Sequence, residues 1–443
     1  MATQWGVVRA DQRGNIAVAM NLLDDLDARG LIHDSTDRAA LAARLAEGPI
    51  SVYVGFDPTA DSLHAGNLLG QVMLRRFQLA GHRPVVLAGG ATGMVGDPGG
   101  RSEERNLLDA ATLAHNVSCI KRQLERILEF DGVPNPARLV DNATWTAPIG
   151  VLDFLRDVGK YFTVNQMVAK ESVRARMESE NGISFTEFSY MLLQSNDFRH
   201  MFEVDGVEMQ MGGSDQWGNI TGGIELVRRR HGGQAYGLTW PLLTRSDGQK
   251  MGKSVNGALW LDPAKVSPYQ FRQYWIQLPD ADVERFLLQL TLRPVAEIRE
   301  LVAAHQEAPE RRLAQRALAA DVTTIVHGSA AEKAAAEAAE VLFGGDPTSA
   351  TAEALAVVAA EAPCIEISEQ IDGLRVHELL VQAKVAKSNG EVSRLLGQKA
   401  VRAGNRVLDE DGVLQQSDLL SGGFLLLRKG KREFVVGKFL PRG

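Results

Sequence analysis

The segment YVGFDPTADSLHAGN, residues 53–67, has the order strand, loop and helix, with polar side chains where the helix starts. The helix is expected to begin near Leu63, which puts His64 and Asn67 on its first turns. The first turn of a helix presents unpaired N–H groups and the positive end of the helix dipole, and both suit a phosphate. An imidazole and an amide there add further donors, so the segment predicts a phosphate-binding site.

A purely structural interpretation of this segment is that Asp61 and Ser62 cap the helix and that His64 faces solvent. The context favours the functional interpretation. The segment follows the first predicted strand of an α/β sheet, and nucleotides bind at such strand-to-helix crossovers.

A second segment, RSDGQKMGKS at 245–254, carries Lys250 and Lys253 in a loop interrupted by glycine. Its Gly-Lys-Ser ending resembles a P-loop, but the first glycine of that motif would fall on Asp247, so the spacing excludes it. Paired lysines on a mobile loop can neutralise charge that grows on a triphosphate in the transition state. A solvated basic turn is the alternative that this segment alone leaves open.

Two further segments place polar side chains within or next to apolar stretches of the sequence. In FTEFSYMLLQSNDF, the side chains of Tyr190, Gln194 and Asp197 share one face of a helix. In GGSDQWGN, Asp215 and Gln216 stand just before a helix, after glycines that permit a close backbone approach. Each placement alone is more often structural, but together they are typical of a small-molecule pocket.

The segment GGATGMVGDP, residues 89–98, is rich in glycine and follows a predicted strand. It does not spell G-x-G-x-x-G, which disfavours a dinucleotide site of that type. Asp97 within it is suited to act as the counterion of an ammonium group.

These segments require a scaffold, and the pattern between residues 50 and 260 predicts one. Short apolar runs alternate with amphipathic ones in the order ISVYVGF, NLLGQVMLRRFQLAG, PVVLAGG, a helix over 108–130, and ARLVDN. Helix-like segments over 149–199, a strand at 206–211, a helix at 216–230 and the strand GLTWPLLT follow. This alternation is typical of βαβ units, so we expect an α/β fold with a doubly wound, Rossmann-like parallel sheet.

The chain is long enough for about three domains. The pattern divides it into an extension at 1–19, the sheet domain at 20–267, a helical domain at 268–345, a linker at 346–370 and a small α+β module at 371–443. The linker assignment rests on GGDPTSAT and on an Ala-rich stretch after it that carries little further pattern.

Composition excludes several classes of protein. With 45% hydrophobic and 23% charged residues, the chain is neither disordered nor collagen-like. Two cysteines, Cys119 and Cys364, can build neither a disulfide framework nor a multi-cysteine zinc site, which favours the reducing cytoplasm. No apolar run approaches the roughly 18 residues of a membrane span, and the start does not resemble a secretion signal.

Charge is distributed unevenly along the chain. The segment 375–443 holds 13 Lys and Arg against 7 Asp and Glu, a net charge of +6, whereas the preceding residues carry −13. A basic tail behind an acidic body suggests a module that contacts nucleic acid, although chance remains the alternative.

The motifs together resemble a known family. HAGN resembles the HIGH motif of class I aminoacyl-tRNA synthetases, and KMGKS resembles their KMSKS loop. The phrases YVGFDPTADSLH, GGATGMVGDP, GISFTEFSYM and GGSDQWGNI, and their order, are similar to those of the bacterial tyrosyl-tRNA synthetases. The resemblance covers about residues 20–443, and it implies a helical tRNA-contacting domain and a C-terminal S4-like RNA-binding module.

This resemblance implies a reaction and its partners. The carboxylate of L-tyrosine would attack the α-phosphate of ATP, and the tyrosyl group would then pass to the terminal ribose of tRNA(Tyr). ATP would bring Mg²⁺, and neither a protein nucleophile, a protein-held metal nor a prosthetic group would be needed. A homodimer is implied by the resemblance alone.

The resemblance also implies roles for single residues. The phenol of the substrate would meet Tyr53 and Asp197, and its amino group would meet Tyr190, Gln194 and Asp97, with Gln210 and Gln216 lining the same pocket. ATP would contact Gly55, Asp57, Thr59, His64, Asn67, Asp215, Lys250 and Lys253.

Three positions depart from the family motifs: Ala65 and Asn67 within HAGN, and Gly252 within KMGKS. One alternative function is a regulatory S4-type RNA-binding protein with a vestigial synthetase body, but such a protein should have lost His64 or the two lysines. A tryptophanyl-tRNA synthetase is the other alternative, and the pair of Tyr53 and Asp197 suits a phenol better than an indole.

Overall fold

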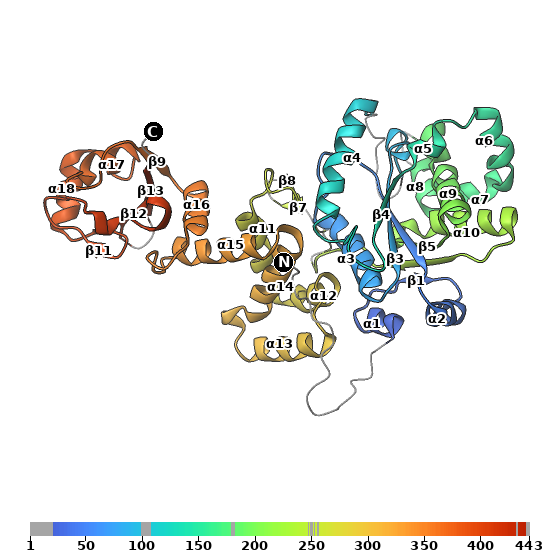
Figure 1. Ribbon diagram of the computed structural model, residues 1–443, viewed down its shortest axis with the longest axis horizontal. Helices are drawn as coiled ribbons and strands as arrows, with labels where there is room; N and C mark the ends of the chain where they lie inside the picture. Colours follow the sequence, from blue (N-terminus) through green and yellow to red (C-terminus); the bar gives the residue numbers. More distant parts are fainter. Residues whose placement is uncertain are drawn as a thin grey trace. The chain divides into compact units, whose positions relative to one another are not determined.

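The structure is a computed structural model, and it describes residues 21–439 apart from 99–107, 179–181, 247, 249–250, 252, 255–256 and 431–432. It divides into two compact units (Figure 1). The first unit holds the described residues up to Asp262 together with Pro279–Ala314, and the second holds Pro263–Leu278 and the described residues from Gln315 onward.

A six-stranded sheet forms the centre of the first unit, in the order β1-β6-β5-β2-β3-β4. Its strands are β1 (Asp34–Ser35), β2 (Ser51–Phe56), β3 (Arg83–Ala88), β4 (Arg138–Asp141), β5 (Val207–Gly213) and β6 (Tyr236–Trp240). Strands β2 to β6 pair in parallel, which confirms the predicted Rossmann-like α/β fold.

The edge strand β1 corrects the expectation of an all-parallel sheet, because it pairs antiparallel with β6 and makes the sheet mixed. Its two residues are polar and have no alternating pattern that would identify them in the sequence. Hydrogen bonds specify the pairing instead, since Asp34 N–H donates to Thr239 Oγ1 at 3.0 Å and Thr239 Oγ1 donates to Asp34 Oδ2 at 3.2 Å.

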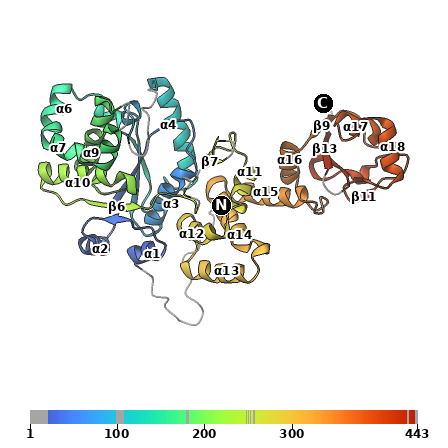
Figure 2. The same cartoon turned by 180° about the vertical axis from the view of Figure 1, so that it is seen from behind.

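Helices cover both faces of the sheet (Figures 1 and 2). The longer ones are α3 (Ala65–Leu79), α4 (Ala110–Leu124), α9 (Phe185–Asp205) and α10 (Trp217–His231). Shorter ones are α1 (Leu22–Ala28), α2 (Arg38–Glu47), α5 (Ala143–Thr146), α6 (Val151–Asp157), α7 (Val164–Val168) and α8 (Glu171–Met177). A two-stranded hairpin of β7 (Lys253–Ser254) and β8 (Gly257–Ala258) lies outside the main sheet.

The core beneath the sheet joins β2 to α9. Tyr53 is 1% exposed and meets the buried Phe198 edge-on, with ring centroids 5.3 Å apart. Val85, Leu87, Met201 and Val207 belong to the same buried cluster. Burial of these side chains fixes α9 against the strands, and with it the polar stripe of that helix.

Two more helices belong to the first unit, α12 (Asp280–Leu290) and α13 (Val295–Glu307). The buried Arg29 donates to the carbonyls of Leu288 and Arg293 at 3.2 and 2.7 Å, and the buried Arg76 donates to those of Leu288 and Thr291. These guanidinium groups satisfy carbonyls at the C-terminal end of α12 that no helical N–H can reach. They tie α12 to α1 and α3.

The segment 268–345, predicted as one helical domain, is therefore shared between the units. In the second unit lie α11 (Pro268–Ile276), α15 (Ser329–Leu342) and all but the first two residues of α14 (Leu313–His327). The contacts that retain α12 in the first unit join residues more than 200 positions apart, so no local pattern announces them.

The second unit ends in a five-stranded sheet, in the order β11-β10-β12-β13-β9. Its strands are β9 (Cys364–Ile367), β10 (Val401–Ala403), β11 (Arg406–Val407), β12 (Phe424–Lys429) and β13 (Glu433–Phe439), and the helices α17 (Val376–Gln382) and α18 (Asn389–Gly397) pack with it.

The segment 346–370, predicted as a linker, contains α16 (Ala352–Glu361) and β9. Leu355 and Val358 of α16 share a buried cluster with Leu426 and Val436 of the sheet, and β9 pairs in parallel with β13. The Ala-rich stretch is thus a packed helix, because alanine favours helix and its small side chain permits close contact. The expectation of a linker was wrong for these residues.

Across the described part of the chain, no helix is long and apolar enough to cross a membrane.

Candidate active site

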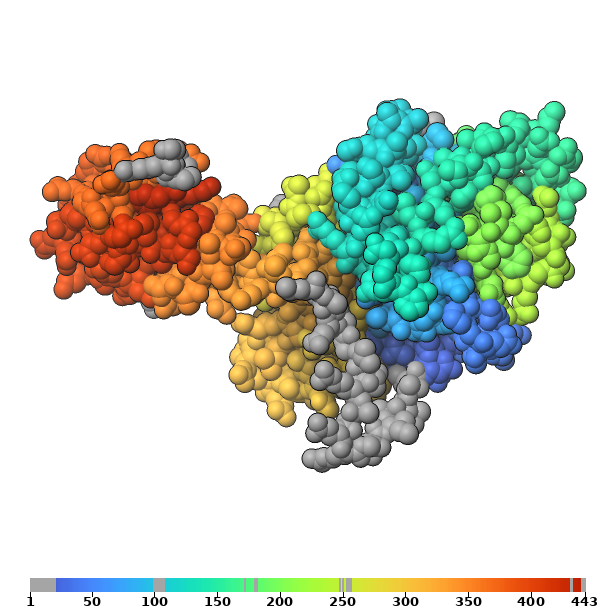
Figure 3. Space-filling view, in the orientation of Figure 1, coloured from blue at the N-terminus to red at the C-terminus, as the bar shows by residue number. Residues whose placement is uncertain are grey.

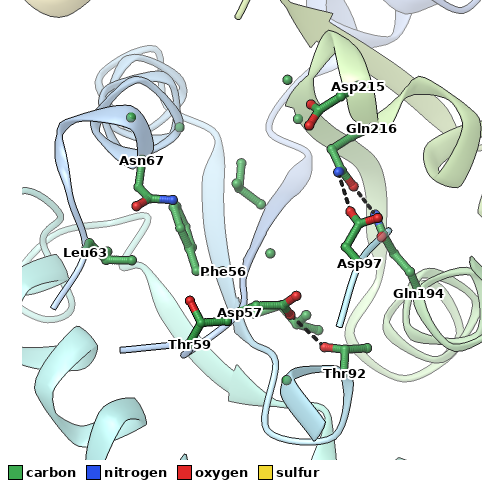
Figure 4. A pocket seen from close by; sticks show the side chains of 18 of the residues that line it. Phe56, Asp57, Thr59, Leu63, Asn67, Thr92, Asp97, Gln194, Asp215 and Gln216 are labelled. Carbon is green, nitrogen blue, oxygen red and sulfur yellow. Dashed lines mark hydrogen bonds between the residues drawn. The ribbon is translucent and has the colours of Figure 1, made fainter. Parts of the chain in front are cut away.

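A cavity of about 760 Å³ opens at the carboxyl ends of β2 and β5. Of the predicted site residues, those that line it are Tyr53, Gly55, Asp57, Thr59, His64, Asn67, Asp97, Tyr190, Gln194, Asp197, Gln210, Asp215 and Gln216. Figure 4 shows several of these side chains converging on one space from different elements. Lys250 and the side chain of Lys253 lie outside the described residues.

One part of the cavity is lined by Tyr53 and Asp197. Asp197 is 1% exposed, and its carboxylate accepts hydrogen bonds from Asn142 Nδ2 at 2.9 Å and Trp145 Nε1 at 2.8 Å. Burial nevertheless raises the pKa of Asp197 to about 7. The hydroxyl of Tyr53 is buried and has no hydrogen-bond partner among the described residues. Such a group costs free energy unless a ligand satisfies it.

A hydrogen-bonded chain runs from this region to Asp57, the residue after β2. Asn142 Nδ2 also donates to Thr92 Oγ1 at 3.0 Å, and Thr92 in turn donates to Asp57 Oδ1 at 2.9 Å (Figure 4). The Tyr190 hydroxyl donates to Asp57 Oδ2 at 3.0 Å. Burial, with Asp57 as the nearest anion, raises the pKa of Tyr190 well above its ordinary value, so the phenol remains a donor.

A second chain of amides orients Asp97. Gln216 Nε2 donates to Asp97 Oδ2 at 2.7 Å, and Gln194 Nε2 donates to Gln216 Oε1 at 3.1 Å (Figure 4). Asn219 Nδ2 donates to Gln194 Oε1 at 3.0 Å. Gln210 is 2% exposed, and within the described part of the chain its Oε1 has no hydrogen-bond partner. Carboxylates and amide oxygens on this wall suit a cationic group.

His64 differs from its predicted place on the helix. The helix α3 begins at Ala65, and His64 is its N-cap rather than part of its first turn. Gly66 N–H donates to His64 Nδ1 at 3.0 Å, and His64 N–H donates to Asn67 Oδ1 at 3.1 Å. This reciprocal arrangement is a capping box. It places the ring proton of neutral His64 on Nε2 and leaves the Asn67 Nδ2 group as a donor.

Backbone pairing braces this end of α3. Ala65 N–H donates to Leu259 O at 2.8 Å, and Leu261 N–H donates to Leu63 O at 2.9 Å. Gln123 of α4 accepts from Leu63 N–H at 2.9 Å through its side-chain oxygen. The segment after the lysine-bearing loop is therefore fixed to the segment that carries His64.

Four residues that line or support the cavity were assigned no role from the sequence: Thr92, Asn142, Trp145 and Trp260. Thr92 and Asn142 follow the carboxyl ends of β3 and β4, and that position was the available signal. Trp145 and Trp260 had none. Among the described residues, no group of three or more His, Cys, Asp or Glu is placed to hold a metal ion.

Comparison with known proteins shows similarity along most of the chain. Residues 45–344 match the family model "tRNA synthetases class I (W and Y)", and residues 355–436 match "Tyrosine--tRNA ligase SYY-like C-terminal domain". A tyrosine--tRNA ligase of Opitutus terrae is 52% identical over 95% of this chain and 100% of its own length. One from Anaeromyxobacter dehalogenans is 50% identical over 94% and 99%.

Solved structures agree. A C-terminally truncated mitochondrial tyrosyl-tRNA synthetase of Aspergillus nidulans superposes with a TM-score of 0.66 at 31% identity, over 73% of this chain and 94% of its own. A tryptophanyl-tRNA synthetase of Encephalitozoon cuniculi shares the fold, with a TM-score of 0.51 at 15% identity over 70% of this chain and 87% of its own.

The raised pKa of Asp197 predicts a pH-dependent stability. With a pKa of about 7 in the fold and 3.8 as its ordinary value, Asp197 is protonated in the folded state and ionised in the unfolded state between these pH values. The free energy of unfolding should therefore fall by about 1.4 kcal/mol per unit as pH rises through that window. Urea unfolding at pH 5 and pH 7.5 measures this.

Asp197→Asn should lose this part of the pH dependence. Asp153→Asn, at a carboxylate that is 58% exposed, is the matched control and should retain it. Identical pH profiles for Asp197→Asn and the parent would contradict the assignment.

Proposed function

Because the chain belongs to the tyrosine–tRNA ligases, a family of class I tRNA synthetases, its reaction is the ATP-dependent attachment of tyrosine to tRNA, and we propose how the pocket performs it. The observation that carries the proposal is the buried Tyr53 hydroxyl, which no described residue hydrogen-bonds and which lies in the same cavity as the Asp197 carboxylate. A substrate phenol can donate to Asp197 and accept from Tyr53. Phenylalanine would leave the Tyr53 hydroxyl unsatisfied and would give Asp197 no donor in addition to Asn142 and Trp145.

The substrate's ammonium group binds on the opposite polar wall. Asp97 supplies the negative charge, and Tyr190 and Gln194 supply oriented polar groups. The hydrogen bonds from Gln216 to Asp97 and from Gln194 to Gln216 support this assignment, because they hold the carboxylate in one orientation before the substrate arrives. Gln210, whose Oε1 lacks a partner, lines the same space.

ATP occupies the part of the cavity next to the start of α3. Thr59, His64 and Asn67 contact its phosphates, and Gly55 and Asp215 lie near its ribose, with Asp57 between the two substrates. A Cβ added at Gly55 would meet only Leu87, at 3.4 Å, so protein packing does not require glycine there. Close approach of a ligand explains it better.

The departure at Asn67 is compatible with this role. Its side-chain oxygen completes the capping box, and its Nδ2 group remains available to a phosphate oxygen. His64 donates through Nε2. Lys250 and Lys253, with Mg²⁺ brought by ATP, would neutralise charge on the departing pyrophosphate.

In the chemical step, a carboxylate oxygen of tyrosine attacks the α-phosphorus of ATP and the bond to the bridging oxygen of pyrophosphate breaks. The terminal ribose hydroxyl of tRNA(Tyr) then attacks the activated carbonyl, and AMP leaves. The residues of the pocket position both substrates and stabilise developing charge, and none forms a covalent bond.

The module formed by 371–443 would bind tRNA as an S4-like domain, for which its net charge supplies the attraction. The regulatory alternative has no support, since the relatives reported above are ligases along their full length. The reaction would take place in the cytoplasm, as the two-cysteine composition favours.

A homodimer is part of the proposal. Of the eleven most exposed large apolar side chains in the described residues, six lie between 151 and 185: Val151, Leu152, Leu155, Val164, Met177 and Phe185. The helices of this segment form part of the outer surface of the first unit, in green in Figure 3. Exposed apolar side chains in such number favour an interface between two copies, and analytical ultracentrifugation of the full chain tests it.

The reaction is tested by pyrophosphate exchange with each of the twenty amino acids, and tyrosine alone should support rapid exchange.

In Tyr53→Phe, kcat/KM for tyrosine should fall about tenfold while that for phenylalanine rises or stays unchanged, because the lost hydroxyl served only the phenol. The KM for ATP should not change. An equal loss for both amino acids would contradict the assignment of Tyr53.

Removal of the C-terminal module should separate the two steps. Truncation after residue 370 would remove the sheet on which α16 packs and leave this helix without its packing partner. The truncated chain should therefore end at 345. Exchange with tyrosine should then persist while tRNA charging is lost, because every residue proposed to contact tyrosine or ATP precedes 254. For the full chain, tRNA affinity should fall with salt by roughly 0.7 to 0.9 in log-log slope per phosphate contact. Equal loss of both activities would show instead that the module supports folding.

A further inference from the structure

The start of the lysine-bearing segment is attached to the helix α12. Asp282, in the first turn of α12, accepts from Ser246 N–H at 2.9 Å and from Ser246 Oγ at 3.0 Å. Arg285 also donates to this carboxylate, at Oδ1 and 2.9 Å, and to the carbonyl of Thr244. Asp282 is 1% exposed, so its carboxylate depends on these donors in place of water.

The helix α12 is in turn attached to the helix that borders the cavity. Arg76 lies on α3, the helix capped by His64, and it donates to the carbonyls of Leu288 and Thr291 at the end of α12. Arg29 holds the same end of α12. Ser246 is therefore connected, through α12, to α3, the helix whose start carries His64 and Asn67.

The residues that follow the lysine-bearing segment are fixed to the start of α3. Leu259 and Leu261 pair with the backbone at 63–65, and Met251 N–H donates to Leu243 O at 2.9 Å. Residues 246 and 259 thus have defined positions relative to the phosphate side of the cavity. Lys250 and Lys253 lie between them in the sequence.

We infer that Asp282 is a positioning residue for adenylate formation: through Ser246 it fixes the point from which the segment bearing Lys250 and Lys253 reaches the phosphates. This inference rests on the proposed role of those lysines. Asp282 itself is not among the described residues that line the cavity. Its effect should therefore appear in the rate of the chemical step and not in tyrosine binding.

The test is a double-mutant cycle with Asp282→Asn and Lys253→Ala. The asparagine has one acceptor oxygen where three donors now meet, so the single-turnover rate of adenylate formation at saturating ATP should fall about tenfold or more. The Kd for tyrosine, measured by equilibrium dialysis without ATP, should change less than twofold. In the Lys253→Ala background, Asp282→Asn should cause a smaller loss than in the parent, because one of the two lysines through which it acts is already absent.

Two more variants keep the test decisive. Ser246→Ala removes only the hydroxyl bond and should cause a smaller loss in the same direction, even if Asp282→Asn folds poorly. Asp418→Asn is the matched control, because Asp418 is 4% exposed and accepts from Gln415 N–H and Arg406 in the second unit. It should leave adenylate formation at the parental rate.

Four outcomes would overturn the inference, the last of them together with the proposed role of Lys253. If Asp282→Asn had the parental rate and Lys253→Ala were slow, the inference would be overturned while the proposed role of Lys253 stood. Losses that multiply in the double variant, or a tyrosine Kd that weakens as much as the rate, would also overturn it. A parental rate in Lys253→Ala would instead refute the proposed role of that lysine, and the inference with it.

Discussion

Burial of the Asp197 carboxylate is the constraint around which the pocket is organised. A carboxylate at 1% exposure is costly unless hydrogen-bond donors replace water, and those donors come from outside its own helix. Trp145 of α5 and Asn142 just before it supply them, while Tyr53 of β2 lies in the same cavity without a partner. The sheet and α9 must therefore have a defined position relative to each other, and the packing of Tyr53 on Phe198 stabilises that position.

The same constraint links the two regions of the cavity that are proposed to bind substrate. Asn142 accepts from Ala91 N–H at 2.7 Å and donates to both Asp197 and Thr92, so its side chain is fully committed. Thr92 continues the chain to Asp57, which also receives the Tyr190 hydroxyl. A pocket built in this way is oriented before substrate binds, and tyrosine can be selected at one end while its carboxylate is aligned at the other.

Charge placement follows from the fold of α3 and α12. One end of α3 presents the capping box of His64 and Asn67 to the cavity, and its other half carries Arg76, which holds α12. Burial and the neighbouring Arg29 lower the pKa of Arg76 to about 9, and the carbonyls of α12 provide its hydrogen bonds. The helices that follow the sheet in sequence are thus partly an extension of the catalytic unit.

Local pattern in the sequence determined the strand, loop and helix around His64, the face of α9 that carries Tyr190, Gln194 and Asp197, and the alternation that makes a parallel sheet. These features repeat at the short periods of strands and helices, or occupy motif spacings of a few residues. The cap at His64 is also local, since its partners Gly66 and Asn67 lie two and three positions away. Tertiary structure alone decided that β1 pairs antiparallel at the edge of the sheet, that α16 is a packed helix, and that Asn142, Trp145 and Asp282 support the site. Their partners lie between 36 and 205 positions away in the chain, at Ser246, Asp197 and Thr239 among others. Hydrogen bonds over such separations depend on where the folded elements meet, and no spacing within one segment encodes them.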